Sequence, residues 1–206
     1  MMEARLKPVI KGDTMILSHL WGLHTNPQQE WQLIDAKKQE LIYVISHILL
    51  ISLVPAICCY FSAVYLGWYV NADEIITLAP KVALLTALSM YCLLVGSVFL
   101  LASLAYKMAG FCHAKTTFSQ SFELASYAAT PLLICGFAAL YPQIWFMTLV
   151  GSCGLLYSIY LLFSGVPILI HVSEDKRRVY TYALLCSGLL LLFGLGSAIL
   201  YIWIQQ

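Results

Sequence analysis

Five long apolar runs constrain this chain more than any other feature of its sequence. A helix needs about 20 residues to cross the hydrocarbon core of a bilayer, which is about 30 Å thick. The runs cover residues 41–65, 78–108, 122–141, 144–170 and 180–203. In lipid every backbone polar group must be satisfied within the protein, and a helix does this within one segment. The sequence therefore predicts an all-α, polytopic membrane bundle of five transmembrane helices. In the first of them, Pro55 predicts a kink or local unwinding.

The overall composition agrees with a chain that is embedded in lipid. Hydrophobic residues make up 61% of the 206 residues and charged residues only 10%, whereas charged residues are about 25% of a soluble domain. The net charge of +1 provides no large field for attracting nucleic acid. We therefore expect the lipid bilayer as the main partner and no nucleic acid. A homo-oligomer or contacts with other membrane proteins stay open.

Positive charge predicts how the helices are oriented, because Lys and Arg are enriched in cytoplasmic connections. The basic residues fall before the first run, around the second connection and in the fourth connection: Arg5, Lys7, Lys11, Lys37, Lys38, Lys107, Lys115, Lys176, Arg177 and Arg178. The first connection carries Asp73 and Glu74 instead, and only Lys81 lies on the opposite side. With five spans, this pattern predicts a cytoplasmic N-terminus and a C-terminus outside.

Residues 1–40 are too few for an independent core and are predicted to form a cytoplasmic segment ahead of a five-span domain at residues 41–206. Asn26 and Pro27 are residue types that favour a helix N-cap and the first helical position. The short amphipathic helix that follows is expected to lie on the membrane surface or to run into the first span. An apolar cluster at residues 16–23 is expected to contact the membrane surface, with a partner-binding peptide as the alternative.

The residues do not point to an enzyme or to a cofactor. The seven cysteines show no C-x-x-C spacing typical of zinc, redox-pair or haem-attachment sites, and most lie in apolar runs as small packing residues. No H-E-x-x-H motif is present. The G-S-C-G stretch at residues 151–154 has no nearby histidine to act as the base of a serine nucleophile, and close helix packing explains it better.

Three ionisable residues near the predicted cytoplasmic side form a candidate polar site. His47 lies about six residues into the first run, or about 9 Å deep at 1.5 Å per residue. Glu123 opens the third run, and His171 ends the fourth. Two imidazoles and a carboxylate at similar depth could hold a divalent metal or relay protons. Alternatively, each is an interfacial residue satisfied by headgroups, water or a helix end.

Motifs of prolines, aromatic residues and glycines give the chain a family resemblance. They are Y-A-A-T-P at 127–131, L-Y-P at 140–142, L-L-Y-S-I-Y-L-L-F-S-G-V-P at 155–167, S-H-L-W-G-L at 18–23 and N-P-Q-Q-E-W at 26–31. With these motifs the chain resembles the Yip family, and within it a bacterial branch. The resemblance implies a small five-span protein of the bacterial inner membrane with a cytoplasmic N-terminus. Eukaryotic members associate with Rab GTPases, a role that does not transfer directly to a bacterial protein.

The positions that match the family motifs are predicted to form a polar seam between the third and fourth spans. They are Tyr127, Thr130, Pro131, Tyr157, Tyr160, Gly165 and Pro167. The prolines free backbone carbonyls, and the hydroxyls can satisfy neighbouring polar groups. A structural role for this seam is favoured over ligand binding.

Two functional hypotheses follow from these observations. The first is a non-enzymatic inner-membrane protein that organises the membrane or partner proteins. The alternative is a small channel or transporter for an ion, a proton or a metal, which would use His47, Glu123 and His171 together with helices broken by proline. No convincing internal repeat relates the two halves of the chain, as many transporter folds would require.

Overall fold

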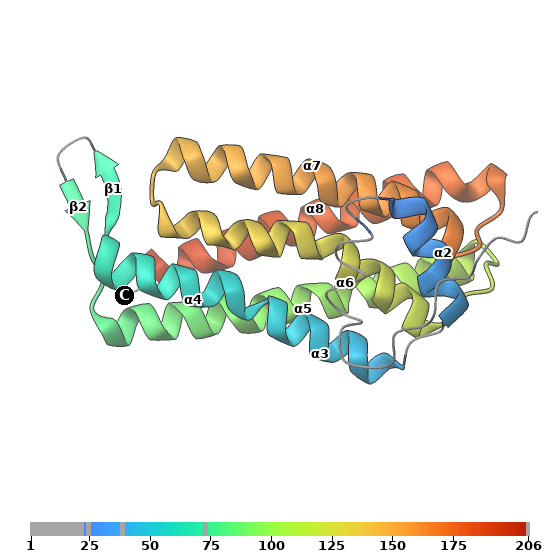
Figure 1. Ribbon diagram of the computed structural model, residues 1–206, viewed down its shortest axis with the longest axis horizontal. Helices are drawn as coiled ribbons and strands as arrows, with labels where there is room; N and C mark the ends of the chain where they lie inside the picture. Colours follow the sequence, from blue (N-terminus) through green and yellow to red (C-terminus); the bar gives the residue numbers. More distant parts are fainter. Residues whose placement is uncertain (1–22, 24–25, 38–39, 72–73, 205–206) are drawn as a thin grey trace, which may run out of the picture.

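The computed structural model describes residues 23, 26–37, 40–71 and 74–204. Five helical segments in this part of the chain are long and apolar enough to cross a membrane. They are Leu41–Leu66, Pro80–Phe111, Phe118–Leu140, Ile144–Leu169 and Glu174–Tyr201. The five segments lie side by side along the long axis of the molecule (Figure 1). Each predicted run overlaps one of them, so the predicted five-helix bundle is confirmed.

The first span is not one regular helix. Helix α3 (Leu41–Ile51) and helix α4 (Leu53–Phe61) are separated at Ser52, and a π-helix, η1 (Ser62–Leu66), ends the span. Pro55 in α4 has no N–H to donate to the carbonyl four residues earlier, so the helix is interrupted next to it. The kink predicted for this span is therefore present, and it lies just before the proline.

A short β-hairpin follows the first span, where the sequence predicted only a connection. Strands β1 (Trp68–Asn71) and β2 (Glu74–Ile76) pair antiparallel, with Trp68 opposite Ile76. Gly67 precedes the hairpin with a φ of 72°, a conformation that glycine adopts without steric cost. The hairpin projects from one end of the bundle (Figure 1), and every span itself remains helical.

The second and third spans are helices α5 (Pro80–Phe111) and α6 (Phe118–Ile134), and α6 continues as a 3₁₀-helix, η2 (Cys135–Leu140). A reciprocal capping box starts α6. The Thr117 hydroxyl accepts a hydrogen bond from the Gln120 backbone N–H at 3.3 Å, and Gln120 Oε1 accepts one from the Thr117 backbone N–H at 2.9 Å. This cap places the helix start ahead of the predicted run, which began at residue 122.

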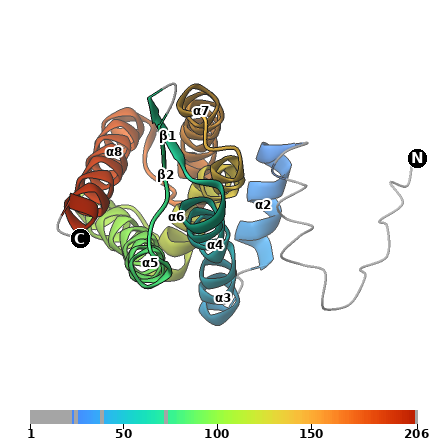
Figure 2. The same ribbon diagram turned by 90° about the vertical axis from the view of Figure 1, so that its left-hand side faces the viewer.

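The last two spans are helices α7 (Ile144–Leu169) and α8 (Glu174–Ile204). Viewed along the bundle, α6 lies in the middle, with α5, α7 and α8 around it (Figure 2). In the most apolar stretch of α6, 61% of the residues are buried, against 6% in that of α8. Helix α6 is therefore the centre of the fold, and α8 is its outermost helix.

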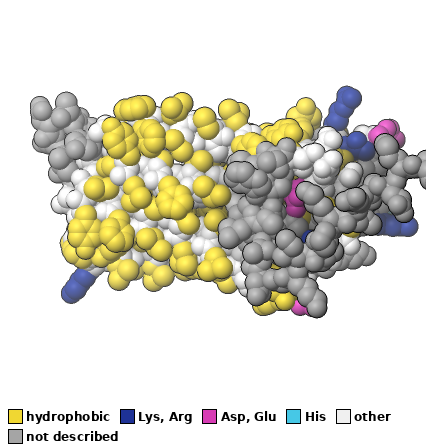
Figure 3. Space-filling view, viewed as in Figure 1, with side chains coloured by type: hydrophobic (Ala, Val, Ile, Leu, Met, Phe, Trp, Pro, Cys, Tyr) yellow, Lys and Arg dark blue, Asp and Glu magenta, His cyan; other side chains and the backbone are white. Residues whose placement is uncertain are grey.

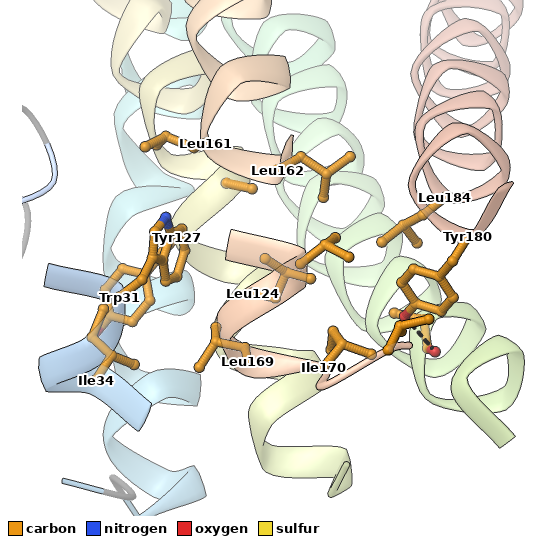
Figure 4. Packing of buried hydrophobic residues seen from close by; sticks show 14 of the residues in the cluster. Trp31, Ile34, Leu124, Tyr127, Leu161, Leu162, Leu169, Ile170, Tyr180 and Leu184 are labelled. Atoms are coloured by element: carbon orange, nitrogen blue, oxygen red, sulfur yellow. Dashed lines mark hydrogen bonds between the residues drawn. The ribbon is translucent and has the colours of Figure 1, made fainter. Parts of the chain in front are cut away.

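Helix α2 (Pro27–Lys37) begins at the predicted proline and lies across one end of the bundle (Figure 1). Its Trp31 and Ile34 are fully buried beside α6 and α7 (Figure 4). Trp31 Nε1 also donates a hydrogen bond to Ser164 Oγ of α7 at 3.0 Å. Helix α2 therefore docks on the bundle, whereas the sequence favoured the membrane surface or the first span.

The upstream apolar cluster predicted at residues 16–23 lies outside the described residues except for Leu23. Leu23 is buried in the same core as Trp31, and its carbonyl accepts a hydrogen bond from the Tyr157 hydroxyl at 2.8 Å. Leu23, the last residue of the cluster, therefore packs into the bundle.

Charge is distributed unevenly along the bundle. On the face shown in Figure 3, hydrophobic side chains make up much of the surface between the two ends, and the Lys and Arg side chains of the described residues gather mainly at the end where α2 lies. The connection between α5 and α6 and the one between α7 and α8 meet at this end, opposite the hairpin (Figure 1). This matches the charge pattern of the sequence. A cytoplasmic location for this end follows from the charge rule and remains a prediction.

Candidate functional site

His47 is buried in α3 and contacts two residues of the predicted seam. Its Nε2 lies 2.9 Å from Thr130 Oγ1, and its ring centroid lies 5.3 Å from that of Tyr127. The Thr130 hydroxyl donates its proton to the Ser126 carbonyl at 2.8 Å. The His47 Nε2–H must therefore be the donor to Thr130. This buried hydrogen bond joins α3 to α6 within the bundle.

Glu123 is buried in α6, and its Oε2 has no hydrogen-bond partner among the described residues. The hydroxyls of Ser121 and Ser126 on the same helix are also buried without one. Because α6 begins at Phe118, Glu123 lies beyond the first turn, where the helix dipole has its main effect. A helix end therefore does not explain this carboxyl. An ionisable residue in this position is a functional-site candidate by default.

His171 lies in the connection between α7 and α8 and belongs to a different set of contacts. Its Nε2 is 3.5 Å from Asp35 Oδ2 of α2, and 48% of its side chain is exposed. Gln120 Nε2 donates a hydrogen bond to the other oxygen of the Asp35 carboxylate at 2.9 Å. These contacts attach α2 to the end of the bundle.

The three predicted site residues are thus not assembled as one ligand set. His47 pairs with Thr130, and His171 pairs with Asp35. Within the described ranges, no three or more His, Cys, Asp or Glu side chains lie together in a way that could hold a metal ion. The buried residues His47 and Glu123 remain as the candidate polar site inside the spans.

The seam predicted from the family motifs is concentrated on α6. Tyr127, Thr130 and Pro131 are all buried there. On α7, the Tyr157 hydroxyl donates to the Leu23 carbonyl at 2.8 Å. Tyr157 therefore connects α7 to the N-terminal segment.

Gly165 is a point of close approach between α7 and its neighbours. A Cβ built at this glycine would lie 2.6 Å from Leu124 Cδ1 and 2.9 Å from Trp31 Cε2. Only a residue without a side chain therefore leaves room for Trp31. The other two predicted members contribute less, because Tyr160 is exposed and Pro167 is half-buried.

The G-S-C-G stretch at residues 151–154 packs at its last residue. A Cβ at Gly154 would collide with Cys135 Sγ and would lie 3.4 Å from Leu132 Cα. At Gly151 a Cβ would meet nothing within 4 Å. Close packing, as predicted for this stretch, is therefore the role of Gly154 and not of Gly151.

Sequence patterns alone did not indicate three residues of this region: Trp31 as a core residue, and Asp35 and Gln120 as the polar link to α2. The spacing of Trp31 and Ile34 on one helix face was the available signal, since residues three apart lie on the same side of a helix. Their partners are on α6 and α7, far away in the sequence, so no local pattern identifies them.

Comparison with known proteins gives a consistent family assignment. The Yip1 domain family matches residues 21–198. The chain is 28% identical over 188 residues to "Inner membrane protein YohC" of Escherichia coli strain K12. The aligned region covers 91% of this chain and 96% of that protein. The values for YohC of Escherichia coli O6:H1 strain CFT073 are the same. No solved structure matches the chain significantly.

These comparisons and the five apolar spans agree on the location of the protein. The similar proteins are named as inner membrane proteins, and the described part of the chain has five helices that can cross a bilayer. The chain is therefore a multi-pass protein of the inner membrane, as the resemblance implied. Because the family match extends over residues 21–198, which is most of its length, the chain belongs to the Yip1 domain family.

Proposed function

We propose that this protein works without catalysis, by holding other membrane proteins, or further copies of itself, against its outer helices. The observation that supports this proposal most directly is the uneven burial of the spans. Only 6% of the most apolar stretch of α8 is buried within the chain, against 61% for α6. Helix α8 is thus attached to the bundle along one side and leaves most of its surface open.

The open side of α8 has the composition of a helix–helix interface in lipid. Leu190 and Phe193 are 72% and 74% exposed. A Cβ at Gly194 or Gly196 would meet nothing within 4 Å. In membranes, small residues let two helix backbones approach closely, and van der Waals packing of the neighbouring side chains then stabilises the pair. This face therefore favours a partner that is itself a membrane helix.

Crosslinking in native membranes tests this proposal, because Cys186 is an exposed cysteine on the same helix. One face of α8 carries Cys186, Leu190 and Phe193, because they are spaced four and three residues apart. In a variant that keeps Cys186 as its only cysteine, we expect a bismaleimide to produce a discrete crosslinked species. Gly194→Leu should reduce its yield several-fold, since the leucine separates the backbones.

Two controls make this result specific. Gly151→Leu places the same bulk on an equally open glycine of α7 and should leave the yield unchanged. A variant with the exposed Cys153 of α7 as its only cysteine should crosslink less than the Cys186 variant. The proposal fails if no crosslinked species forms at Cys186, or if both leucine variants lower the yield equally.

A second candidate function, as a small channel or transporter for an ion or a proton, is supported by two separate ionisable residues that are buried in the spans, His47 and Glu123. Ionisable residues in spans often mark ion or proton pathways. Flux into proteoliposomes containing the purified protein would test it. His47→Ala and Glu123→Gln should each abolish flux, whereas His113→Ala, at an exposed histidine outside the spans, should not. Absent flux, or flux that is the same in all three variants, rejects this function.

A further inference from the structure

A cavity of about 130 Å³ lies between α5, α6, α7 and α8, and all of its lining residues belong to the membrane-spanning segments. Its lining is almost entirely aliphatic and includes Leu101, Leu132, Leu155 and Leu192, one from each helix. These four helices therefore border a space that none of them fills.

Small residues on three helices leave this space open. Ala129 of α6, Ser158 of α7 and Gly188 of α8 all line the cavity. A Cβ at Gly188 would have only Leu101 Cδ1 in contact range, at 3.8 Å. A larger side chain at any of these positions would occupy the cavity.

Water does not suit this cavity. A buried water makes about three hydrogen bonds, and cavities lined by leucine and similar residues stay dry even at about 150 Å³, where they accept apolar molecules instead. The polar lining consists of Ser97 and Ser158. The Ser97 hydroxyl already donates to the Leu94 carbonyl at 2.7 Å. The Ser158 hydroxyl has no partner among the described residues, but one hydroxyl falls short of the roughly three hydrogen bonds that a buried water makes. If the cavity stayed empty, its lining would lose dispersion contacts. The chemistry of the lining therefore selects an apolar occupant.

The bilayer is the source of such an occupant, because the cavity is continuous with the surface that α8 presents to lipid. Leu155 and Ile159 of α7 and Leu189 and Leu192 of α8 line the cavity and are only half-buried. Helix α8 packs mainly against α5 and much less against α7. The side between α7 and α8 is therefore the open one.

One contact defines the limit of this opening. Phe163 of α7 and Tyr182 of α8 meet edge to face, with ring centroids 5.6 Å apart, and so close the space between the two helices toward the α2 end. An occupant on the side of this pair away from α2 must enter sideways, from the hydrocarbon region of the bilayer. We propose that the cavity binds one acyl chain of a membrane phospholipid, which enters between α7 and α8.

Photolabelling of the reconstituted protein tests this proposal. The full chain would be placed in vesicles of phosphatidylethanolamine and phosphatidylglycerol that contain a trace of phosphatidylglycerol with a diazirine near the end of one acyl chain. After irradiation, the labelled peptides and residues are identified by mass spectrometry. We expect labelling of Ser158 and Leu192 to exceed that of the outward-facing Phe193 several-fold, since a bound chain stays near them longer than a freely exchanging one.

Variants that fill the cavity provide the decisive comparison. Gly188→Leu and Ser158→Leu should each reduce labelling of the other cavity residues several-fold. Gly194→Leu, on the open face of α8, should leave that labelling unchanged. Melting temperature and elution volume identify any variant that does not fold, and two independent filling variants keep the test usable if one is lost.

The outcomes separate the proposal from its alternatives. It is overturned if cavity residues are labelled no more than Phe193 in the wild type, or equally in wild type and both filled variants. It is also overturned if the cavity residues resist lipid labelling but crosslink to a second copy of the chain. Because Gly194→Leu tests the helix-binding face and Gly188→Leu tests the cavity, this inference and the proposed function can fail independently.

Discussion

Helices α6 and α8 are both spans, yet they relate to the rest of the protein in opposite ways. Helix α6 is the least apolar of the five spans and the most buried, whereas α8 is among the most apolar and the least buried. In water the more apolar helix would be expected inside. In a bilayer the surroundings are as apolar as leucine, so burial in the protein is most useful for the helix that carries polar groups. The comparison shows that hydropathy alone identifies the spans but not the core.

The two helices also differ in what holds them. Helix α6 takes part in a buried hydrogen bond between His47 and Thr130 and in close backbone contacts with its neighbours. Helix α8 is attached chiefly through its first turns, where the Tyr180 hydroxyl donates to the Ala105 carbonyl of α5 at 2.8 Å (Figure 4). Substitutions of residues that pack on α6 should therefore lower stability more than similar substitutions on the exposed faces of the outer helices.

The largest effect is expected for Trp31→Ala, because Trp31 is 0% exposed and packs against Gly165 and Tyr127. Removing a fully buried tryptophan side chain costs about 3–5 kcal/mol, and α2 should detach from α6 and α7. The measurement is the melting temperature in detergent, together with protease accessibility of α2. Trp145→Ala, at a tryptophan that is 62% exposed, should change stability little, and equal losses in both variants would contradict the packing described.

A smaller effect is expected for Gly136→Ala in η2. A Cβ at Gly136 would lie 2.5 Å from Pro55 Cβ and 2.6 Å from Pro55 Cα, so the backbone of α4 must move. Overpacking of this kind costs about 1–3 kcal/mol, and contact with backbone atoms favours the upper part of that range. Chemical unfolding in detergent would measure it. Gly194→Ala, which meets no atom, is the control, and a loss of stability there would remove the contrast between α6 and α8.

Thr130→Val tests the buried hydrogen bond of His47. Valine keeps the shape of threonine but leaves His47 Nε2 without its partner, which costs about 1–2 kcal/mol for a buried polar group. Thr148→Val removes a hydroxyl that donates to the Ile144 carbonyl at 2.8 Å on an exposed face, and its effect should stay within about 0.5 kcal/mol. Thermal unfolding of the two variants under the same conditions makes the comparison. If Thr148→Val were as destabilising as Thr130→Val, the burial of the His47–Thr130 hydrogen bond would not be the cause of the lost stability.

The smallest effect is expected for Tyr180→Phe in α8. The aromatic ring remains in the core, and the hydrogen bond to the Ala105 carbonyl is lost, which corresponds to about 1 kcal/mol. Tyr182→Phe alters an exposed tyrosine and should be neutral in the same unfolding measurement. A loss well above that of Thr130→Val would show that α8 is held more firmly than its low burial indicates.

Much of the fold could be predicted from the sequence because each span is encoded locally. Apolar runs of sufficient length identified all five spans, and Pro55 indicated where the first would be interrupted. The hairpin at β1 and β2 was not predicted, since its pairing depends on Gly67 and on cross-strand register and not on an extended alternating pattern. Helix α2 was predicted, but its docking on the bundle was not. Gly165 and Ser164, which contact Trp31, lie on α7, far from α2 in the sequence.

The candidate site was predictable in its members but not in their partners. His47 and Glu123 stood out because ionisable residues are rare within apolar runs, and both are buried in the structure. Similar depth in the membrane suggested one cluster with His171. Depth does not fix the direction of a side chain around its helix, and the structure instead pairs His47 with Thr130 and His171 with Asp35.

The polar character of α6 has a consequence for how the protein is made. A span with serines, a threonine and a glutamate is a poor candidate for entering lipid by itself. Helices α3 and α5 precede α6 in the chain and both pack against it, so they are already in place when α6 leaves the ribosome. We therefore expect the insertion of α6 to depend on these earlier helices, so that a shortened chain beginning at Phe118 would insert poorly while α8 would still insert alone.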